Sequence, residues 1–523
     1  MLHKEIIDEQ LKKALHLQHE GQYDEALLLY YSIKQSMPTN LDSIYQLGVI
    51  SNIKKNYQLA VDLFSEAIVI DPSNPLYYFN CGIAYEGLNQ LESAIKCYDT
   101  VISFNSNYAD VHYNRGVCFQ RLKKLESAID CYDKVIFLNS DHVNAYFNRG
   151  VAFQELRQFE FAIESYDRAI SLNPNIADIH FNRGAVFHCL NLLVAAIECY
   201  DKAIALNPNH VNALWNKTLA LLLNGDLASG FQLFELGAEL KTRQVQQDFS
   251  EPLWLGKESL EGKTILLHNE QGLGDTLQFC RYAKLVSNLG GSVILKAQPP
   301  LISLLNNLEG VSYLVPEGEH VPKFDYQCPL MSLPLAFKTD INSIPASKSY
   351  IKCSPDKILQ WAEKLGEKLK LRIGIAWSST SDFAHDANRS LSLAELLLAL
   401  PPNNFEYICL QKVIKESDQE TLKSNPQIKF FGEELHDFSD TAALIENLDL
   451  VITTCTSIPH LSGALGKETW LLLSFTPDWR WLLEREDSPW YPTAKLYRQD
   501  KIGDWGDALE RVKVDLEKLH LFK

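Results

Sequence analysis

The chain has 523 residues, of which 46% are hydrophobic, and its formal net charge at pH 7 is −17. These values allow packed cores over about three domains of ~150 residues each and exclude a disordered chain. The negative charge argues against nucleic acid or an anionic membrane as the main partner, because both would repel the protein.

The cysteines and the apolar runs indicate a cellular compartment. None of the eleven cysteines forms a Cys-x-x-Cys pair or a Cys/His cluster with zinc spacing, so we expect no metal site. No apolar run approaches the ~20 residues of a membrane span, and residues 1–5 lack the apolar core of a signal peptide. We therefore expect a cytoplasmic protein with no transmembrane segment.

A period of 34 residues organises the first part of the chain. Alanine recurs at this interval, and an aromatic residue follows each alanine four positions later. The alanines are Ala26, Ala60, Ala94, Ala128, Ala162 and Ala196, and the aromatic residues are Tyr30, Phe64, Tyr98, Tyr132, Tyr166 and Tyr200. The period is that of the tetratricopeptide repeat, a helix–turn–helix unit that buries its apolar face by stacking on its neighbours. We predict about seven such repeats over residues 1–240, which form an α-helical superhelix.

Glycine and proline recur with the same period. The glycines fall where the first helix of a repeat must approach the second closely, and the prolines fall where the second helix must end. These residues are Gly48, Gly82, Gly116, Gly150 and Gly184, with Pro38, Pro72, Pro174 and Pro208. We expect close contact between two helices at each glycine.

An asparagine ladder lies two residues before the glycine position of five repeats. It consists of Asn80, Asn114, Asn148, Asn182 and Asn216. A carboxamide both donates to and accepts from one peptide group, so these residues on the concave face predict binding of a protein or peptide. Alternatively, asparagine is an ordinary residue at this position of the repeat and has no binding role.

A set of charged residues accompanies the asparagines. Arg115, Arg149 and Arg183, with Asp110 and Asp178 nearby, form either a charged lining or solvated pairs on the outer face. The solvated face is the default interpretation for such helix charges.

Short apolar runs alternate with helical segments after about residue 250, which predicts parallel α/β sheets. We predict strands at 264–268, 293–295, 311–315 and 324–326, and a second set at 372–377, 407–410, 429–431, 450–452 and 469–473. Helices are expected at 357–370, 391–400 and 439–448. After a connector at 241–260, the two Rossmann-like units span 261–355 and 356–523 and face a cleft, which is the default ligand site.

The loop after the strand at 264–268 contains the first candidate site. Gly272 and Gly274 would let the backbone approach a substrate closely. Asp275 either caps the following helix or directs its carboxylate into the cleft. Because this motif occurs in many α/β proteins, it indicates a functional site only if a second motif supports it.

The loop after the strand at 450–452 contains that second site. Thr456 and Ser457 precede a helix, whose backbone N–H groups and dipole favour an anion such as a diphosphate. His460 lies one turn further and either donates to a phosphate or sugar oxygen or is structural.

Together these motifs resemble the glycosyltransferase family 9 (heptosyltransferase-like) GT-B domains over about residues 261–510. The matching runs are Gly272–Asp275, Gly374–Trp377, Asn388–Ser390, Leu410–Lys412, Asp440–Ile445 and Thr456–Gly466. Residues 477–492 are similar to a bacterial subgroup that joins tetratricopeptide repeats to such a domain. The eukaryotic protein O-GlcNAc transferases also resemble this chain, since their repeats carry a similar asparagine ladder and precede a glycosyltransferase.

The resemblance implies an inverting, metal-independent transfer from a nucleotide-diphosphate sugar, which is the donor substrate, with no cofactor. In that family the aspartate of the first loop is the general base, which implies this role for Asp275. The leaving diphosphate would be stabilised by the second loop and by one basic residue, with Arg389 as first choice and Lys412 as second. The implied binding residues are Gly272, Gly274, Arg389, Lys412, Thr456, Ser457 and His460.

Two hypotheses from different classes follow. The first is a transferase whose repeats recruit its acceptor, and the second is a binding scaffold with a degenerate domain. Asp275, Arg389 and His460 favour the enzyme, whereas Cys455 favours the scaffold, because related sequences usually have aspartate there. A set of aromatic residues either stacks on a sugar or, as we favour, packs the last helix onto the sheet: Trp479, Trp481, Trp490 and Tyr491.

Overall fold

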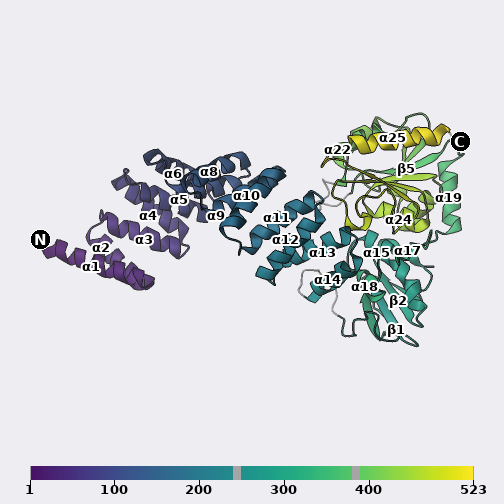
Figure 1. Ribbon diagram of the computed structural model, residues 1–523, viewed down its shortest axis with the longest axis horizontal. Helices are drawn as coiled ribbons and strands as arrows, with labels where there is room; N and C mark the ends of the chain where they lie inside the picture. The colour runs from purple at the N-terminus through teal and green to yellow at the C-terminus, as the bar shows by residue number, and fades with distance from the viewer. Residues whose placement is uncertain (1, 240–248, 380–388, 522–523) are drawn as a thin grey trace. The chain divides into compact units, whose positions relative to one another are not determined.

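The computed structural model describes residues 2–239, 249–379 and 389–521. Its contacts divide the chain into two compact units, which meet in sequence between Val186 and Phe187. The first unit contains only helices, and the second contains the last repeats together with the sheets (Figure 1). Within the described residues, no helix has both the length and the apolar character needed to cross a membrane.

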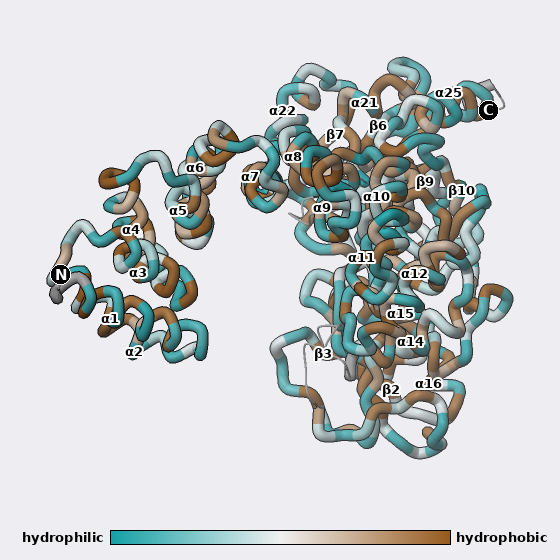
Figure 2. The backbone as a smooth tube through the Cα atoms, turned by 60° about the vertical axis from the view of Figure 1, so that its left-hand side comes forward, coloured by the Kyte–Doolittle hydropathy of each residue, from teal (hydrophilic) through white to brown (hydrophobic). Residues whose placement is uncertain are grey.

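The described residues up to Glu239 form fourteen helices, which are the seven predicted helix pairs. They are α1 (Leu2–His19), α2 (Tyr23–Ser36), α3 (Leu41–Ile53), α4 (Tyr57–Ile70), α5 (Pro75–Gly87), α6 (Leu91–Phe104), α7 (Ala109–Arg121), α8 (Leu125–Leu138), α9 (Val143–Glu155), α10 (Phe159–Leu172), α11 (Ala177–Cys189), α12 (Leu193–Leu206), α13 (Val211–Leu223) and α14 (Leu227–Glu239). Hydrophobic and hydrophilic residues alternate along helices such as α1 to α4 (Figure 2), as amphipathic packing requires.

The periodic glycines permit the predicted close approach of helices. A Cβ on Gly48 would lie 2.6 Å from the ring of Phe64, and a Cβ on Gly82 would lie 2.5 Å from the ring of Tyr98. The same contact recurs at Gly116 and Gly150. The periodic alanines and aromatic rings are 0–1% exposed. The predicted core of the repeats is therefore confirmed.

The turn inside each repeat contains one residue with a left-handed backbone. These residues follow the 34-residue period and have φ between +58° and +87°: Gly21, Lys55, Asn89, Lys123, Arg157, Asn191 and Gly225. Only two of them are glycine, although a side chain in this conformation costs roughly 1–2 kcal/mol. The turn geometry is therefore kept in every repeat whatever the residue type.

Two parallel sheets follow the repeats. The first contains β1 (Thr264–His268), β2 (Ser292–Ala297), β3 (Tyr313–Pro316) and β4 (Tyr326–Pro329) in the order β3-β2-β1-β4. The second contains β5 (Arg372–Ala376), β6 (Glu406–Cys409), β7 (Ile428–Phe430), β8 (Leu450–Thr454), β9 (Thr469–Leu473) and β10 (Ala494–Arg498) in the order β10-β9-β8-β5-β6-β7. Every predicted strand is present within three residues of its predicted ends, and β10 is additional.

Helices connect these strands. They are α15 (Leu273–Phe279), α16 (Ala283–Ser287), α17 (Ile302–Leu305), α18 (Leu333–Ala336), α19 (Pro355–Leu365), α21 (Leu393–Leu397), α22 (Glu416–Lys423), α23 (Phe438–Glu446), α24 (Ser457–Leu465) and α25 (Gly506–Leu521), with short 3₁₀ turns that include η1 (Cys280–Tyr282) and η5 (Trp479–Trp481). The three predicted helices correspond to α19, α21 and α23. Helix α19 ends before residue 370 because Gly366, at φ +75°, terminates it.

The strand order of each sheet reverses at one point. In the first sheet the chain leaves β1 through β2 and β3 and returns to the other side of β1 as β4. In the second sheet it leaves β5 through β6 and β7 and returns beside β5 as β8. Ligands of parallel sheets bind outside the carboxyl ends of strands at such points. The loops after β1 and β8, which carry both predicted sites, lie at these positions.

Candidate functional site

The two predicted loops are brought together by direct packing of α15 against α24. A Cβ on Gly274 would lie 2.8 Å from the His460 ring, so this approach requires glycine. The sequence predicts that Gly274 admits a substrate, whereas its close neighbour in the structure is His460. A Cβ on Gly272 would meet only a carboxylate oxygen of Asp275, at 3.4 Å.

Asp275 is both a helix cap and a charged group of the junction between the loops. Its Oδ2 accepts a hydrogen bond of 2.9 Å from the Gly272 N–H at the start of α15. Its Oδ1 forms an ion pair with Arg480. Burial raises the pKa of Asp275, although the charge of Arg480 opposes this shift. Its side chain remains 21% exposed, so the two interpretations of this residue, cap and site carboxylate, are compatible.

Arg480 holds the junction together, although the sequence analysis gave it no role. Besides Asp275, its guanidinium contacts Asp478 at 3.0 Å, and its Nε donates to Gln278 Oε1 at 2.6 Å. The side chain is 7% exposed and its guanidinium lies 4.4 Å from the ring centroid of Trp479. Burial alone would raise the pKa of Asp478, but Arg480 holds it below its usual value. The charged pair inside the Asp-Trp-Arg-Trp run was the available signal.

His460 lies inside the junction as a neutral ring. Its Nδ1 lies 2.9 Å from the hydroxyl oxygen of Tyr491, and its ring stacks on Trp481 with centroids 5.4 Å apart. Burial lowers the pKa of His460 to about 3, so it carries no charge at neutral pH. Any interaction of His460 with a phosphate would therefore be a hydrogen bond from an uncharged imidazole.

Hydroxyl groups surround the start of α24. Thr456 is its N-cap, since the side-chain oxygen accepts from the Ile458 N–H at 3.2 Å, and Ser457 is the first helical residue. Thr454, at the end of β8, is fully buried, and its Oγ1 has no hydrogen-bond partner among the described residues. The loop after β8 therefore contains one buried hydroxyl without a hydrogen-bond partner among the described residues.

Cys455 follows this threonine and is paired with an indole. The Trp481 Nε1–H donates to Cys455 Sγ at 3.1 Å. Burial raises the pKa of the thiol to about 12, and the charges of Arg389 and Arg480 oppose this shift. The charge of Arg389 therefore reaches Cys455, whereas no such effect on this thiol involves Lys412. Lys412 instead donates to the His436 carbonyl oxygen at 3.3 Å on the surface, and Asn388 lies outside the described residues.

The aromatic residues of segment 479–491 pack in the interior, as the sequence analysis favours. Trp479, Trp481, Trp490 and Tyr491 are at most 5% exposed. Their partners differ from the prediction, however. Trp490 packs edge-on against Phe279 of α15, and Tyr491 lies against Gly463 of α24, whereas the last helix, α25, packs on β10. The prediction of packing is confirmed and that of the partner was wrong, because the segment fills the space between α15 and α24.

A second buried polar cluster lies at the carboxyl end of the first sheet. His268, Asn269, Glu270 and Lys296 are at most 7% exposed. His268 Nε2 lies 2.9 Å from Gln327 Oε1. None of the predicted site residues belongs to this cluster, although three consecutive polar residues directly after a buried strand are a signal for it.

Two residues of the asparagine ladder, Asn80 and Asn148, make contacts between repeats. Asn80 Nδ2 donates to the Tyr45 hydroxyl at 3.2 Å, and Asn148 Nδ2 donates to the Tyr113 hydroxyl at 3.1 Å. All five asparagines of the ladder are partly exposed. The amides therefore have structural partners, and peptide binding by them stays a prediction.

The arginines of the repeats pair with different aspartates from those expected. Each contacts an aspartate 16 residues earlier, on the preceding helix, in the pairs Arg115–Asp99 (2.8 Å), Arg149–Asp133 (2.7 Å) and Arg183–Asp167 (2.7 Å). The expected Asp110 and Asp178 lie on the same helices as the arginines and do not take part in these pairs. The aspartates are about half exposed, as in solvated pairs.

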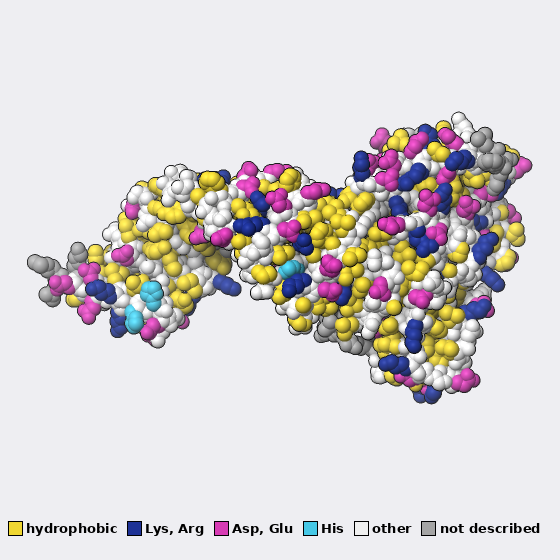
Figure 3. All heavy atoms as spheres, viewed as in Figure 1, with side chains coloured by type: hydrophobic (Ala, Val, Ile, Leu, Met, Phe, Trp, Pro, Cys, Tyr) yellow, Lys and Arg dark blue, Asp and Glu magenta, His cyan; other side chains and the backbone are white. Residues whose placement is uncertain are grey.

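Surface charge and possible metal ligands were the remaining features to compare with the sequence. On the face drawn in Figure 3, basic and acidic side chains are interspersed over the surface. Among the residues that the structure describes, no group of three or more His, Cys, Asp or Glu side chains is arranged to hold a metal ion.

Comparison with known proteins identifies the repeats. The sequence matches the family described as tetratricopeptide repeat over residues 109–142, 143–176 and 177–210, and the TPR repeat family over 52–89 and 87–123. This part of the chain consists of tetratricopeptide repeats. These matches confirm that the 34-residue period is that of the tetratricopeptide repeat.

Curated relatives match parts of the chain. FlbA of Caulobacter vibrioides is 26% identical over 290 residues, which are 50% of this chain and 48% of FlbA. A probable UDP-N-acetylglucosamine–peptide N-acetylglucosaminyltransferase SPINDLY of Solanum lycopersicum is 27% identical over 92 residues, which are 18% of this chain and 10% of that protein. The chain thus matches about half of the first relative and a tenth of the second.

Solved structures resemble the repeats in part. The crystal structure of YrrB, a TPR protein with an unusual peptide-binding site, is 19% identical with a TM-score of 0.33 and covers 36% of this chain and 98% of its own. A tetratricopeptide repeat protein from Parabacteroides merdae is 17% identical with a TM-score of 0.37 and covers 45% of this chain and 93% of its own.

Proposed function

We propose that the protein is a glycosyltransferase of GT-B type that moves a sugar from a nucleotide-diphosphate sugar to an acceptor recruited by the repeats. The observation that carries this proposal is the meeting of the loops after β1 and β8, each at the reversal point of its sheet, with Asp275 on one and the start of α24 on the other. Open parallel sheets bind ligands at such points. The weak similarity to SPINDLY, whose name denotes a peptide N-acetylglucosaminyltransferase, supports a transferase role.

Asp275 is the proposed general base. The acceptor hydroxyl must lose its proton as it attacks the anomeric carbon, and a carboxylate oxygen accepts it. Burial raises the pKa of Asp275 and makes it a stronger base, while Arg480 and the Gly272 N–H fix the orientation of the carboxylate. Positioning of this kind contributes to rate because the reacting groups are held in the reactive geometry.

The loop after β8 is the proposed site of the leaving diphosphate. The N–H groups at the start of α24 point away from the helix, where its dipole favours negative charge. Two side chains are candidates to stabilise the diphosphate. They are Thr454, whose hydroxyl is unpaired, and Arg389, whose charge acts on Cys455. Of the two predicted basic residues, Arg389 is the better candidate.

A second candidate function is a repeat scaffold with an inactive α/β part. It is favoured by one observation: both carboxylate oxygens of Asp275 already have partners, Gly272 and Arg480. In that case Asp275 is only a structural cap and counter-ion. The two functions differ in whether a nucleotide sugar binds and reacts.

The test compares two aspartates that share the same arginine. The donor is first identified by the melting-temperature shift with uridine, guanosine, adenosine and cytidine diphosphate sugars, since a ligand of the native state raises this temperature. Asp275→Asn should lower transfer by roughly 10²–10⁴-fold, as loss of a general base does, with unchanged donor affinity. Asp478→Asn, the matched control, removes the other carboxylate of Arg480 and should retain most of the transfer rate.

The scaffold alternative gives a different result. If no nucleotide sugar raises the melting temperature, or if both substitutions reduce donor binding and transfer equally, Asp275 is a structural residue. The proposal then fails.

A further inference from the structure

A cavity of ≈ 840 Å³ lies in the second unit, and no residue of α15 or α24 lines it. It is lined by Asn191–Ala195, Glu198, Leu223–Gly225, Ile341, Leu482–Arg485 and Asp487. The walls therefore come from turns of the last repeats, from the loop after α18 and from the segment that follows η5. Its volume is within the range of ligand-binding clefts.

The lining combines exposed apolar side chains with unbalanced acidic groups. Leu192 and Val194 are 51% and 65% exposed. Arg485 is neutralised by Asp487 through two contacts of 2.7 Å. Glu198 and Glu484 form no ion pair with any residue that the structure describes, so the cavity has two uncompensated negative charges.

One of the lining residues, Asn191, has an unsatisfied acceptor. Its Nδ2 donates to the Phe475 carbonyl oxygen at 2.7 Å, while its Oδ1 is buried and has no hydrogen-bond partner among the described residues. A buried acceptor without a partner costs free energy, so a donor from outside the chain would be stabilised here.

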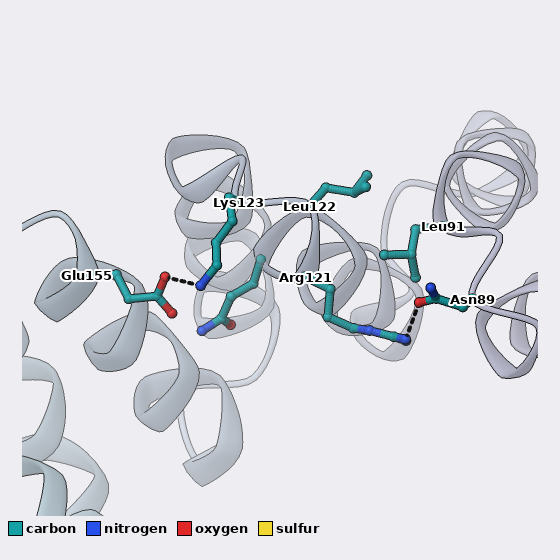
Figure 4. A pocket seen from close by; sticks show the side chains of 7 residues that line it. Asn89, Leu91, Arg121, Leu122, Lys123 and Glu155 are labelled. Atoms are coloured by element: carbon teal, nitrogen blue, oxygen red, sulfur yellow. Dashed lines mark hydrogen bonds and ion pairs between the residues drawn. The ribbon is translucent and has the colours of Figure 1, made fainter. Parts of the chain in front are cut away.

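An equivalent groove of the first unit contains a hydrogen bond that the cavity lacks. Asn89 occupies the same turn position three repeats earlier, and there its Oδ1 accepts from Arg121 Nη2 at 2.7 Å (Figure 4). The residue three repeats after Arg121 is Leu223, which lines the cavity. The second unit therefore has the asparagine acceptor of this pair without its arginine donor.

The opposite wall is a segment held in an unusual backbone conformation. Leu482 and Glu484 both have φ of +54°, which is costly for residues with side chains. Arg498 fixes the segment, since its Nη2 donates to the Trp481 carbonyl oxygen at 2.7 Å and its Nε to that of Arg485 at 3.1 Å. A wall held in this way is preformed, which lowers the entropic cost of binding.

We propose that this cavity docks a peptide segment of a partner protein that contains arginine next to aliphatic residues. The guanidinium donates to Asn191 Oδ1, as Arg121 does to Asn89, and is balanced by Glu198 and Glu484. The aliphatic side chains cover Leu192 and Val194. This site lies outside both the asparagine ladder and the proposed transfer centre, and it does not depend on sugar transfer.

The test measures binding of a fluorescein-labelled peptide of alternating arginine and leucine by fluorescence anisotropy, using the full chain without donor. A peptide with glutamate in place of arginine is the matched probe. The arginine peptide should bind, and Glu198→Lys/Glu484→Lys should weaken it by roughly tenfold or more, because the charges then repel. The control Glu420→Lys/Glu517→Lys makes the same change of charge on two exposed residues outside the cavity and should have no such effect.

A second variant separates this site from general charge attraction. Val194→Trp fills the cavity from an exposed position without changing the charge and should also weaken binding. The inference is overturned if the glutamate peptide binds equally well, if the control variant weakens binding as much as the cavity variant, or if Val194→Trp leaves the affinity unchanged. Because no donor or turnover is involved, these results are independent of whether the transferase proposal holds.

Discussion

The repeats and the junction of α15 with α24 use the same packing device for different purposes. In the repeats a glycine faces a buried tyrosine or phenylalanine ring, and at the junction Gly274 faces His460. The charges differ. In the repeats the ion pairs join neighbouring helices and their aspartates are half exposed, as in Arg115–Asp99. At the junction Arg480 is 7% exposed and joins a carboxylate 205 residues away in sequence. Close helix contact thus sets spacing in the repeats and removes charges from water at the junction.

The largest expected difference between the two regions concerns their arginines. Arg480→Met leaves Asp275 and Asp478 without their cation and should destabilise the surroundings of α15 by about 3 kcal/mol. Arg115→Met, the matched change in the repeats, should cost about 0.5 kcal/mol, because its aspartate is solvated. Native-state hydrogen exchange of the helices around each site measures both values.

Arg480→Lys is the control for this comparison, since it retains the charge and loses the planar donor geometry. It should fall between the wild type and Arg480→Met. Similar small losses for Arg480→Met and Arg115→Met would mean that the junction is as well solvated as the surface of the repeats.

The next largest effect is a pH dependence specific to the junction. The pKa of His460 is about 3 in the folded protein and about 6.5 when unfolded, so below pH 6.5 only the unfolded state takes up this proton. Protonation of this residue in the unfolded state should therefore lower the free energy of unfolding by about 1.4 kcal/mol per pH unit as the pH falls from 6.5 towards 3. In His460→Gln the stability of the second unit should depend less steeply on pH across this window, as measured by urea unfolding at pH 7 and pH 5. An unchanged slope would contradict the burial of a neutral His460.

Replacement of the glycine by alanine at each close contact should have a smaller effect on stability. Gly274→Ala places a Cβ 2.8 Å from His460, and Gly116→Ala places one 2.8 Å from Tyr132. Both should destabilise their regions by roughly 1–3 kcal/mol, since the rings are enclosed and cannot move away. Only Gly274→Ala should also reduce donor binding or transfer. Gly272→Ala, which meets no atom closer than 3.4 Å, is the tolerated control.

The smallest expected effect on stability concerns the asparagine ladder. Replacement of Asn114, Asn148 and Asn182 by alanine removes partly exposed hydrogen bonds and should cost about 1 kcal/mol or less per site. If the ladder binds an acceptor peptide, the acceptor KM should rise while donor hydrolysis is unchanged. A constant KM would assign these amides only to contacts between repeats, such as Asn148 with Tyr113.

The sequence was sufficient for the repeats because the glycine–ring contacts of their core recur after 34 residues. The Gly48–Phe64 contact is therefore repeated along the chain and becomes visible as a period. The strands were also predictable, since each is a short buried run. The junction was not, because Asp275, Gln278 and Arg480 come together only through packing of two sheets, and no periodic pattern records a contact over 202 to 205 residues. Arg480 was consequently not predicted as a site residue. Gly274 was predicted to approach a substrate, whereas its close neighbour is His460.

The positions of the tryptophans allow the two units to be distinguished by fluorescence. All nine tryptophans lie at or after position 215, so they belong to the second unit, whereas the first unit has none. Trp479 and Trp481 flank Arg480, and the Trp481 indole N–H contacts Cys455. Emission excited at the red edge of the indole band therefore reports on the second unit alone. A ligand of the junction should shift this emission, while a peptide held only by the first five helix pairs, α1 to α10, should leave it unchanged.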